Sequence, residues 1–208
     1  MLNLLLERYP QLTECADTLS AAVTALIDCY QKGGKLLLCG NGGSCADCDH
    51  IVGELMKGFL KKRPLSGDQK AKMMKNSPLL EETLLNKLQN GLAAIALPSI
   101  AGLNSAFCND VDPELAYAQS VMAMGNEEDA LLAISTSGNA NNVIAAAKVA
   151  KGLGLTVIGL TGKGGGELTG VADICIRVPE TETYKVQELH LPVYHYLCAA
   201  VEDAFFDK

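Results

Sequence analysis

Residues 35–54, with the sequence KLLLCGNGGSCADCDHIVGE, constrain the fold of this chain more than any other stretch. Residues 35–39 form an apolar run of strand length, residues 40–44 a glycine-rich turn, and the residues after them follow a helical pattern. Glycines permit a sharp turn and bring backbone N–H groups close to a ligand, and a serine at the end of the turn can cap the helix. The stretch therefore predicts a strand, an anion-binding turn and a helix.

Residues 129–151 repeat this order. An apolar run over 130–134 is followed by the polar turn 135–139, with the sequence STSGN, and by a helical pattern over 141–151. Three hydroxyl residues and a glycine, placed where a strand leads into a helix, predict a second cradle of hydroxyl and amide groups. This turn alone is a weak signal, but the pair of turns favours phosphate binding.

The remaining apolar runs complete a parallel sheet. Residues 92–97, 156–160 and 173–178 are predicted to be strands, residues 100–107 a helix, and residues 108–110 a polar turn. Strands that alternate with helices predict right-handed crossovers and an α/β fold whose parallel sheet is covered on both faces. Ligands of such sheets bind beyond the carboxyl ends of the strands, which is where both polar turns fall.

Helical periodicity marks the two ends of the chain. Residues 11–31 predict an amphipathic helix within an N-terminal helical segment 1–34, with Thr13 as a possible N-cap and Gly33-Gly34 as the stop. Residues 184–205 predict a final helix that contains Pro192. Because proline lacks a backbone donor, we expect a kink near residues 188–192 or a helix start close to Pro192.

The segment between the first helix unit and the next strand differs in composition. Residues 61–76 are rich in lysine and arginine and predict a flexible basic loop, and Ser77-Pro78 predicts the start of a helix over about 78–90. This helix is either an ordinary packed element or a lid or partner surface on a flexible arm.

Composition excludes several classes of function. The chain has 208 residues, enough for one domain over 1–208, and a net charge of −7, which argues against binding to nucleic acid or to an anionic membrane. No apolar run is long enough to span a membrane, and the first residues lack the pattern of a secretion signal, so we expect a cytoplasmic protein.

The eight cysteines are scattered rather than spaced as a framework, so we expect small buried hydrophobic residues. Cys45 and Cys48 form a CxxC pattern, which leaves open a redox pair or half of a zinc site. No second CxxC is present to complete a site of four cysteines.

Five separated motifs resemble those of the sugar isomerase (SIS) domain family, in the family's order and over nearly the whole chain apart from an insertion at about 65–91. The greatest similarity is to the branch that isomerises ketoheptose 7-phosphates. The resemblance implies a three-layer, flavodoxin-like α/β sandwich and a homotetramer with active sites at subunit interfaces. The motifs are Cys39–Ser44, His50 with Glu54, Asn109-Asp110, Ser135–Asn139, and Gln187 with His195.

The resemblance also implies the roles of single residues. Glu54 and His195 are the implied catalytic pair. Ser44, Ser135, Thr136 and Ser137 are implied to hold a phosphate, and Asn41, Gly42, Gly43, Asn109, Asp110 and Gln187 to contact the sugar. Some family members bind zinc, and the matching positions here are His50, Glu54, Gln187 and His195, a set that would also accept another divalent ion.

The implied reaction is the isomerisation of sedoheptulose 7-phosphate to D-glycero-D-manno-heptose 7-phosphate. Such a reaction moves a proton between adjacent carbons through an enediol, which requires a base near both carbons and an acid for the oxygens. His50 and Glu54 are i, i+4 neighbours on a helix, about 5–6 Å apart at Cβ, so they can share one substrate or one ion. Gln187 and His195 are eight residues apart on another helix and could converge on the same point.

Two other readings of the family remain open. One is an isomerase of a different sugar phosphate, because Ala140, Tyr184 and Gly58 depart from the family's pattern. The other is a non-catalytic SIS protein that acts as a regulatory or binding module. The presence of both Glu54 and His195 favours the enzyme.

Overall fold

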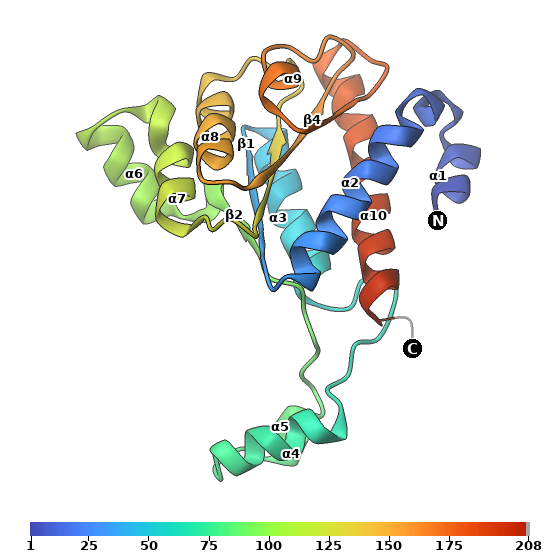
Figure 1. The fold of residues 1–208 in the computed structure, drawn as a ribbon, viewed down its shortest axis with the longest axis vertical. Coiled ribbons are helices and arrows are strands. Elements are labelled where there is room, and N and C mark those ends of the chain that lie inside the picture. The colour runs from blue at the N-terminus through green and yellow to red at the C-terminus, as the bar shows by residue number, and fades with distance from the viewer. Residues whose placement is uncertain (207–208) are drawn as a thin grey trace.

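A computed structural model describes residues 1–206. The chain forms a three-layer α/β sandwich around a five-stranded parallel sheet, with an arm that projects away from it (Figure 1). The strand order is β2-β1-β3-β4-β5, so the two strands that precede the polar turns, β1 and β3, lie side by side in the middle. The strands are β1 (Leu36–Gly40), β2 (Ala94–Ala96), β3 (Ala130–Ile134), β4 (Thr156–Thr161) and β5 (Ile174–Arg177).

The central strands are buried on both faces. Every residue of β1 and β3 is buried, which explains why these strands have no alternation of polar and apolar residues. Side chains on one face of the sheet pack against α2 (Ala16–Gln31), α3 (Gly43–Met56) and α10 (Thr183–Phe206). Side chains on the other face pack against α7 (Ala116–Met124) and α8 (Asn141–Gly152). The sheet therefore separates two hydrophobic cores, and the predicted α/β fold is confirmed.

Several predicted boundaries shift. The first helix is broken into a 3-10 turn, Pro10–Cys15, and α2, and the hydroxyl of Thr13 donates to the Pro10 carbonyl at 2.6 Å instead of capping α2. The predicted strand over 92–97 is limited to β2, because residues Leu97–Ser99 form a 3-10 turn around Pro98. Shorter elements are α1 (Leu2–Arg8), the 3-10 turn Pro113–Leu115 and α9 (Leu168–Val171).

The predicted polar turn over 108–110 is wrong. These residues form the last turn of α6 (Ala101–Asp110), and the chain leaves the helix only at Val111. Asn109 and Asp110 bond to each other, with 2.8 Å between Asn109 Nδ2 and Asp110 Oδ1, and do not make the backbone contacts of a turn. The helix therefore extends three residues beyond its predicted end.

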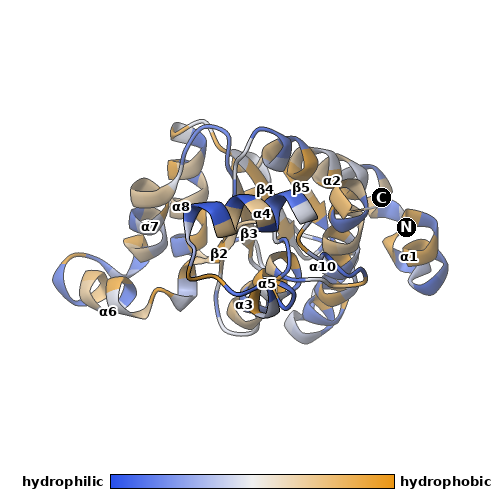
Figure 2. Ribbon diagram, turned by 90° about the horizontal axis from the view of Figure 1, so that it is seen from below, coloured by the Kyte–Doolittle hydropathy of each residue, from blue (hydrophilic) through white to orange (hydrophobic). Residues whose placement is uncertain are grey.

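Residues 64–90 form the projecting arm (Figure 1). The predicted basic loop is wrong, because it contains α4 (Gly67–Asn76), and the predicted helix over 78–90 is reduced to α5 (Glu82–Leu85). A capping box between Ser66 and Gln69 starts α4, and that signal lies in the sequence as Ser-x-x-Gln. Figure 2 shows α4 as a mostly hydrophilic helix, and none of its residues is buried.

The base of the arm is closed by backbone contacts. The Asn90 amide donates to the Arg63 carbonyl at 2.7 Å, and Pro64 and Gln89 form an antiparallel bridge. The arm therefore leaves and re-enters the body at nearly one point.

The final helix α10 is one element of 24 residues that contains Pro192. A helix start close to Pro192 is therefore wrong, because α10 begins at Thr183. Its apolar residues pack on α2 and α3, so tertiary packing outweighs the loss of one backbone hydrogen bond at proline. Over residues 1–206, no helix combines the length and the apolar character that crossing a membrane requires.

Candidate active site

The two polar turns meet at the carboxyl edge of the sheet. Gly40 at the end of β1 pairs with Ile134 at the end of β3, so the turns that follow lie next to each other. Two reciprocal amide hydrogen bonds of 2.8 and 2.9 Å join Asn41 in the first turn to Asn142 at the start of α8, the helix that follows the second turn. The Tyr117 hydroxyl donates either to the Gly40 carbonyl or to the Asn41 side chain, at 3.0 and 3.2 Å. The first turn is therefore fixed to α7 and to the start of α8.

The first turn ends in the N-terminus of α3. Gly42 has φ 57°, a left-handed conformation that favours glycine, and α3 begins at the next residue. A Cβ atom on Gly43 would lie 2.5 Å from the Gln187 side-chain nitrogen, so a larger residue here would displace the Gln187 amide. Ser44 is 3% exposed on the first turn of α3. The structure thus brings Gly42, Gly43, Ser44 and the Gln187 amide together.

The second turn presents hydroxyl groups around a left-handed glycine. Gly138 has φ 68° and donates its amide to the Ser135 hydroxyl at 3.1 Å, and the Asn139 amide donates to the Ser137 hydroxyl at the same distance. Each of these hydroxyls accepts a bond from its own turn, and its proton is then directed elsewhere. The Thr136 carbonyl accepts from the Gly162 amide at 3.0 Å, which fixes the turn to the loop after β4.

A cluster of ionisable side chains lies further along α3. The His50 Nε2 atom is 3.2 Å from Glu54 Oε1, and Lys57 Nζ is 2.9 Å from Glu54 Oε2. The Glu54 side chain is only 15% exposed. One helix therefore holds a carboxylate between an imidazole and an ammonium group.

His195 reaches this cluster from α10. Its ring centroid is 5.0 Å from that of His50 in an edge-to-face arrangement, and Phe59 packs on its other side at 5.5 Å. The Nε2 atom of His195 is buried and has no hydrogen-bond partner among the described residues. Burial lowers the pKa of His195, and His50 lowers it further, whereas Glu54 raises it. A neutral His195 next to the Glu54 carboxylate suits proton transfer near neutral pH.

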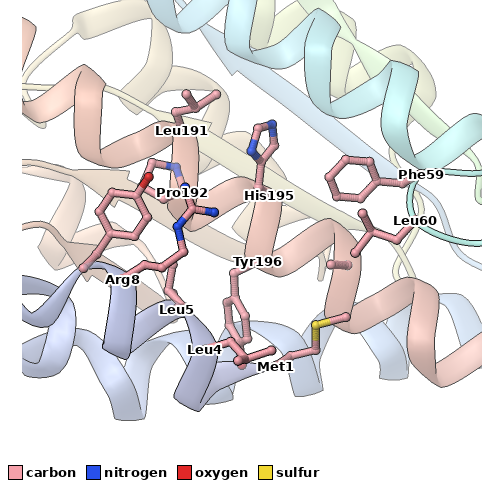
Figure 3. Close-up of a pocket in the computed structure, with 12 residues that line it drawn as sticks. Met1, Leu4, Leu5, Arg8, Phe59, Leu60, Leu191, Pro192, His195 and Tyr196 are labelled. Atoms are coloured by element: carbon pink, nitrogen blue, oxygen red, sulfur yellow. The ribbon is translucent and has the colours of Figure 1, made fainter.

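A groove opens on the outer side of His195 (Figure 3). It has a volume of about 410 Å³ and lies between α1, α10 and the segment that contains Phe59. Most of its lining is apolar, with Leu4 and Leu60 largely exposed. On this side, His195 therefore faces a groove lined mostly by apolar side chains.

Asn109 and Asp110 lie apart from these groups. They end α6, which packs on α7 and the turn Pro113–Leu115 and stands at one end of the molecule (Figures 1 and 2). Their neighbour Cys108 lines a cavity of about 290 Å³ together with Asn41 and Gly42. Within a single chain, Asn109 and Asp110 therefore lie across that cavity from the two turns and apart from the other predicted site residues.

The predicted metal ligands are only partly assembled. Within residues 1–206, no three or more His, Cys, Asp or Glu side chains are placed to hold one metal ion. His50 Nε2 and Glu54 Oε1 fit two ligands of one ion, and the unpartnered His195 Nε2 lies on the ring next to them. The Gln187 amide, however, is turned onto Gly43 at the opposite end of α3 from Glu54.

Four residues of the site had no assigned role in the sequence. Asn142 and Tyr117 hold the first turn, the Tyr194 hydroxyl lies 3.0 Å from His50 Nδ1, and Asp47 is one turn before His50 on α3. Asp47 lies three residues before His50, so helical spacing could have identified it. Tyr117, Asn142 and Tyr194 come from other elements, and only the folded chain brings them here.

The cysteines behave mainly as small hydrophobic residues. All eight are free thiols, five are buried, and Cys108 is the exposed exception. Burial raises the pKa of Cys45 and of Cys48, and the nearby Asp49 raises both further. These thiols lack the electropositive surroundings of a reactive cysteine, which argues against a redox pair.

Comparison with known proteins gives the same picture. SIS domain models match residues 5–89 and 102–200. The chain is 37% identical over 197 residues to the phosphoheptose isomerase of Rhodospirillum rubrum, covering 94% of this chain and 90% of that protein.

Two solved structures are similar over nearly their whole length. The phosphoheptose isomerase of Francisella tularensis has a TM-score of 0.77 at 30% identity, covering 94% of this chain and 91% of that one. The phosphoheptose isomerase of Neisseria gonorrhoeae has a TM-score of 0.71 at 30% identity, covering 90% and 87%. By sequence and by fold, the chain belongs to the SIS domain family.

Proposed function

We propose that this protein is an aldose–ketose isomerase that converts sedoheptulose 7-phosphate to D-glycero-D-manno-heptose 7-phosphate. The observation that carries the proposal is the His50–Glu54 pair, 3.2 Å apart, beside His195 and on the helix that starts at the anion-binding turn. The relatives named phosphoheptose isomerase support the substrate class.

Glu54 is the proposed base. Its carboxylate removes the proton from the carbon next to the carbonyl and returns it to the adjacent carbon, so that the C–H bond broken on one carbon is remade on the other. Its position between His50 and Lys57 fixes the direction of the carboxylate. The low exposure of Glu54 keeps the transferred proton from exchanging freely with solvent.

His195 is the proposed acid and base for the oxygens. Because its pKa is lowered, it is neutral near pH 7 and accepts a hydroxyl proton, which it then gives to the former carbonyl oxygen. The two transfers together convert the ketose to the aldose through an enediol. No net proton is gained or lost.

The turns supply the proposed binding groups. Ser44, Ser135, Thr136 and Ser137 hold the phosphate, where the N-termini of α3 and α8 add a favourable dipole. The sugar hydroxyls bind along Asn41, Gly42, Gly43 and Gln187. Two helix ends and four hydroxyls compensate the phosphate charge in a chain whose net charge is −7.

The proposed assembly is a homotetramer with active sites at subunit interfaces. Asn109 and Asp110 stand apart from Glu54 within one chain, and a second copy would bring such a pair to the sugar. The exposed leucines around the groove of His195 also favour burial against another subunit. No nucleic-acid or membrane partner is proposed, and eight free thiols favour the reducing cytoplasm.

His50, Glu54, Gln187 and His195 are the proposed ligands of zinc or of another divalent ion. When bound, such an ion would polarise the substrate carbonyl. Since Gln187 lies on Gly43, we expect modest affinity, and none of the proton transfers above is assigned to the ion.

The test is turnover of sedoheptulose 7-phosphate by the wild type and by Glu54→Gln and His195→Ala. Loss of a positioned acid or base lowers kcat by roughly 10²–10⁴-fold. A matched control is Glu128→Gln, which removes a half-exposed carboxylate paired with Lys32 on the surface. Full activity in both site variants would refute the assignment. If only a C5 or C6 ketose phosphate is turned over, that sugar replaces sedoheptulose 7-phosphate as the proposed substrate. If no sugar phosphate in the panel is turned over, the result favours a non-catalytic SIS module.

A further inference from the structure

A separate cavity lies at the edge of the sheet beside β5. It has a volume of about 300 Å³ and is lined by residues of the loop after β4, of β5 and the residues after it, and of the start of α2 with the turn before it. None of the residues proposed above to bind the phosphate or the sugar, or to act in catalysis, lines this cavity. It is therefore distinct from the candidate active site.

Two cationic side chains line this cavity. Lys163 lies in the loop after β4, and Arg177 is the last residue of β5. In the described part of the chain, neither of them forms an ion pair, although most of the ion pairs that are present join lysine or arginine to a carboxylate. The whole chain has a net charge of −7. Two unpaired cations in one cavity of an acidic protein indicate a site for an anion.

The backbone fixes the positions of both cationic residues. Arg177 pairs with β4 in the sheet, and its carbonyl accepts the Cys15 thiol at 3.1 Å across the open edge of β5. The Lys163 amide donates to the Glu180 carbonyl at 2.8 Å. Gly165 has φ 72°, and a Cβ atom there would lie 2.9 Å from Arg177 Cδ, so this glycine leaves room for the arginine side chain. The two cations are therefore carried by ordered segments.

The N-terminal part of the lining offers hydrogen-bond acceptors. Glu14 lies in the turn Pro10–Cys15, and Thr18 lies in the first turn of α2. The Thr18 hydroxyl donates its proton to the Cys15 carbonyl at 2.9 Å, so its oxygen can only accept from a ligand. An ionised Glu14 carboxylate also accepts without donating. The cavity thus combines cations for an anionic group with acceptors for hydroxyl groups.

This combination suits the phosphate monoester of a small polyol. Such an ester carries a charge of about −1.5 to −2 at pH 7, which matches two cations, and the arginine fork can bind two phosphate oxygens. No aromatic side chain lines the cavity, so a nucleotide base would find no ring to stack on. A volume of about 300 Å³ is at the lower end for ligand sites, which favours a molecule of few carbons.

We propose that this cavity is a second ligand site, which binds a phosphorylated polyol through the cationic groups of Lys163 and Arg177. Hydroxyl groups of the ligand donate to Glu14 and Thr18. Arg177 ends β5, and the second polar turn follows β3, so two strand spacings, or roughly 10 Å, separate the two sites. A single phosphate group cannot occupy both sites. The inference does not rest on the proposed function.

The first measurement is calorimetric titration of the full chain with glycerol 3-phosphate at about pH 8, where the ester is a dianion, and at low salt. This probe has no carbonyl group, so an aldose–ketose isomerase cannot turn it over. Lys163→Gln and Arg177→Gln should each raise the Kd by about tenfold or more, the usual effect of losing one charge-assisted hydrogen bond. If the polar turns also bind the probe, two sites should be fitted, and only one of them should respond.

Two further variants separate a local contact from a change in overall charge. Lys163→Arg keeps the positive charge and should bind nearly as the wild type does. Lys148→Gln removes one positive charge from an exposed position on α8 outside the cavity, and it should leave the Kd nearly unchanged. Lys163, Arg177 and Lys148 are all exposed, so we expect each variant to keep the melting temperature of the wild type.

The second measurement compares glycerol 3-phosphate with inorganic phosphate to test the role of Glu14. The wild type should bind the polyol ester more tightly, because only the ester has hydroxyl groups. In Glu14→Ala this preference should largely disappear, since inorganic phosphate no longer meets a like charge and the ester loses an acceptor. Asp17→Ala removes an exposed carboxylate of α2 outside the lining, and this control should keep the preference.

Three outcomes would overturn the inference. One is no binding of glycerol 3-phosphate at millimolar concentration, and another is binding that is unchanged in both Lys163→Gln and Arg177→Gln. The third is equal affinity of the wild type for the ester and for inorganic phosphate, which would leave a site for a bare ion only. If the variants respond as expected but no sugar phosphate is turned over, then the proposed function fails while this second site stands.

Discussion

Arg63 and Glu202 form an ion pair with both side chains fully buried and with 2.8 Å between Arg63 Nε and Glu202 Oε1. Arg63 also donates to the carbonyls of Leu55 and Glu54, at 2.6 and 3.2 Å, so it satisfies the last turn of α3. Glu202 accepts the backbone amide of Phe59 at 2.9 Å. The pair therefore joins the C-terminal turn of α3, where Glu54 lies, to the end of α10.

Glu202→Gln should destabilise the protein strongly. It leaves the Arg63 guanidinium buried without its counter-charge, and breaking a buried pair in this way costs about 3–5 kcal/mol. The free energy of unfolding in urea measures the effect. Lys151→Gln is the control, because its pair with Asp173 is 49% and 40% exposed and is worth less than about 1 kcal/mol. An equal decrease in the free energy of unfolding in the two variants would contradict the prediction.

His190 should make the protein less stable in mild acid. It is fully buried, and desolvation lowers its pKa from 6.5 to about 4. Between these pH values the unfolded chain binds a proton that the folded chain does not, so stability falls as the pH falls, by roughly 3 kcal/mol in all. Above about pH 6.5 this contribution is constant. His190→Leu should flatten the pH dependence of unfolding over this window, and an unchanged slope would rule out His190 as its source.

Asn142→Ala should weaken substrate binding more than it slows the chemistry. It removes the reciprocal amide pair that fixes the first turn to the start of α8, while Glu54 and His195 lie elsewhere. We expect KM to rise by roughly tenfold, which corresponds to the loss of about 1.4 kcal/mol of hydrogen-bond free energy. Asn141→Ala is the matched control, because that side chain bonds Glu114 instead. A larger change in kcat than in KM would place Asn142 in the chemical step.

Zinc binding should depend on His50. Calorimetric titration of the metal-free protein with zinc should show modest affinity in the wild type and little binding in His50→Ala, since that variant removes a nitrogen 3.2 Å from Glu54 Oε1. His190→Leu, which removes a histidine remote from solvent, should bind as the wild type does. Equal zinc affinity in His50→Ala would place the metal elsewhere.

The arm should be dispensable for the fold of the body. Replacing residues 66–88 by a short Asn-Gly turn keeps the backbone contacts at its base and removes α4 and α5, whose one buried residue, Leu85, belongs to neither hydrophobic core of the body. We expect the melting temperature of the body to change by only a few degrees. Loss of cooperative unfolding would show that the arm contributes to the main core.

The sequence predicted the sheet well, because fully buried parallel strands are continuous apolar runs and because the glycine and hydroxyl turns mark where they end. The resemblance also grouped His50, Glu54 and His195, whose side chains the fold brings close together, and their roles stay predictions. It failed on the arm, where a basic composition concealed the capping box of Ser66 and Gln69. It also failed at Asn109 and Asp110, whose residue types favour turns but which end a helix.

The contacts that place Tyr194 and Gln187 could not be predicted from local patterns. Tyr194 meets His50 across 144 residues of sequence, and only the packing of α10 on α3 brings these residues together. Gln187 was expected beside His195, yet its side chain turns to Gly43. The choice between these directions depends on the space left by a missing Cβ atom, which helical spacing does not reveal.

The matched contacts between α3 and α10 have one further consequence. Gln187 lies on Gly43 and Tyr194 on His50, so the two helices run in the same direction with the same sequence offset in both contacts. The rise from Ser44 to Glu54 along α3 is roughly 15 Å. In the proposed function, this rigid interval separates the group that holds the phosphate from the group that acts on carbon. The helix pair thereby fixes the distance between these two groups, and a phosphosugar too short to span that distance cannot contact both of them at once.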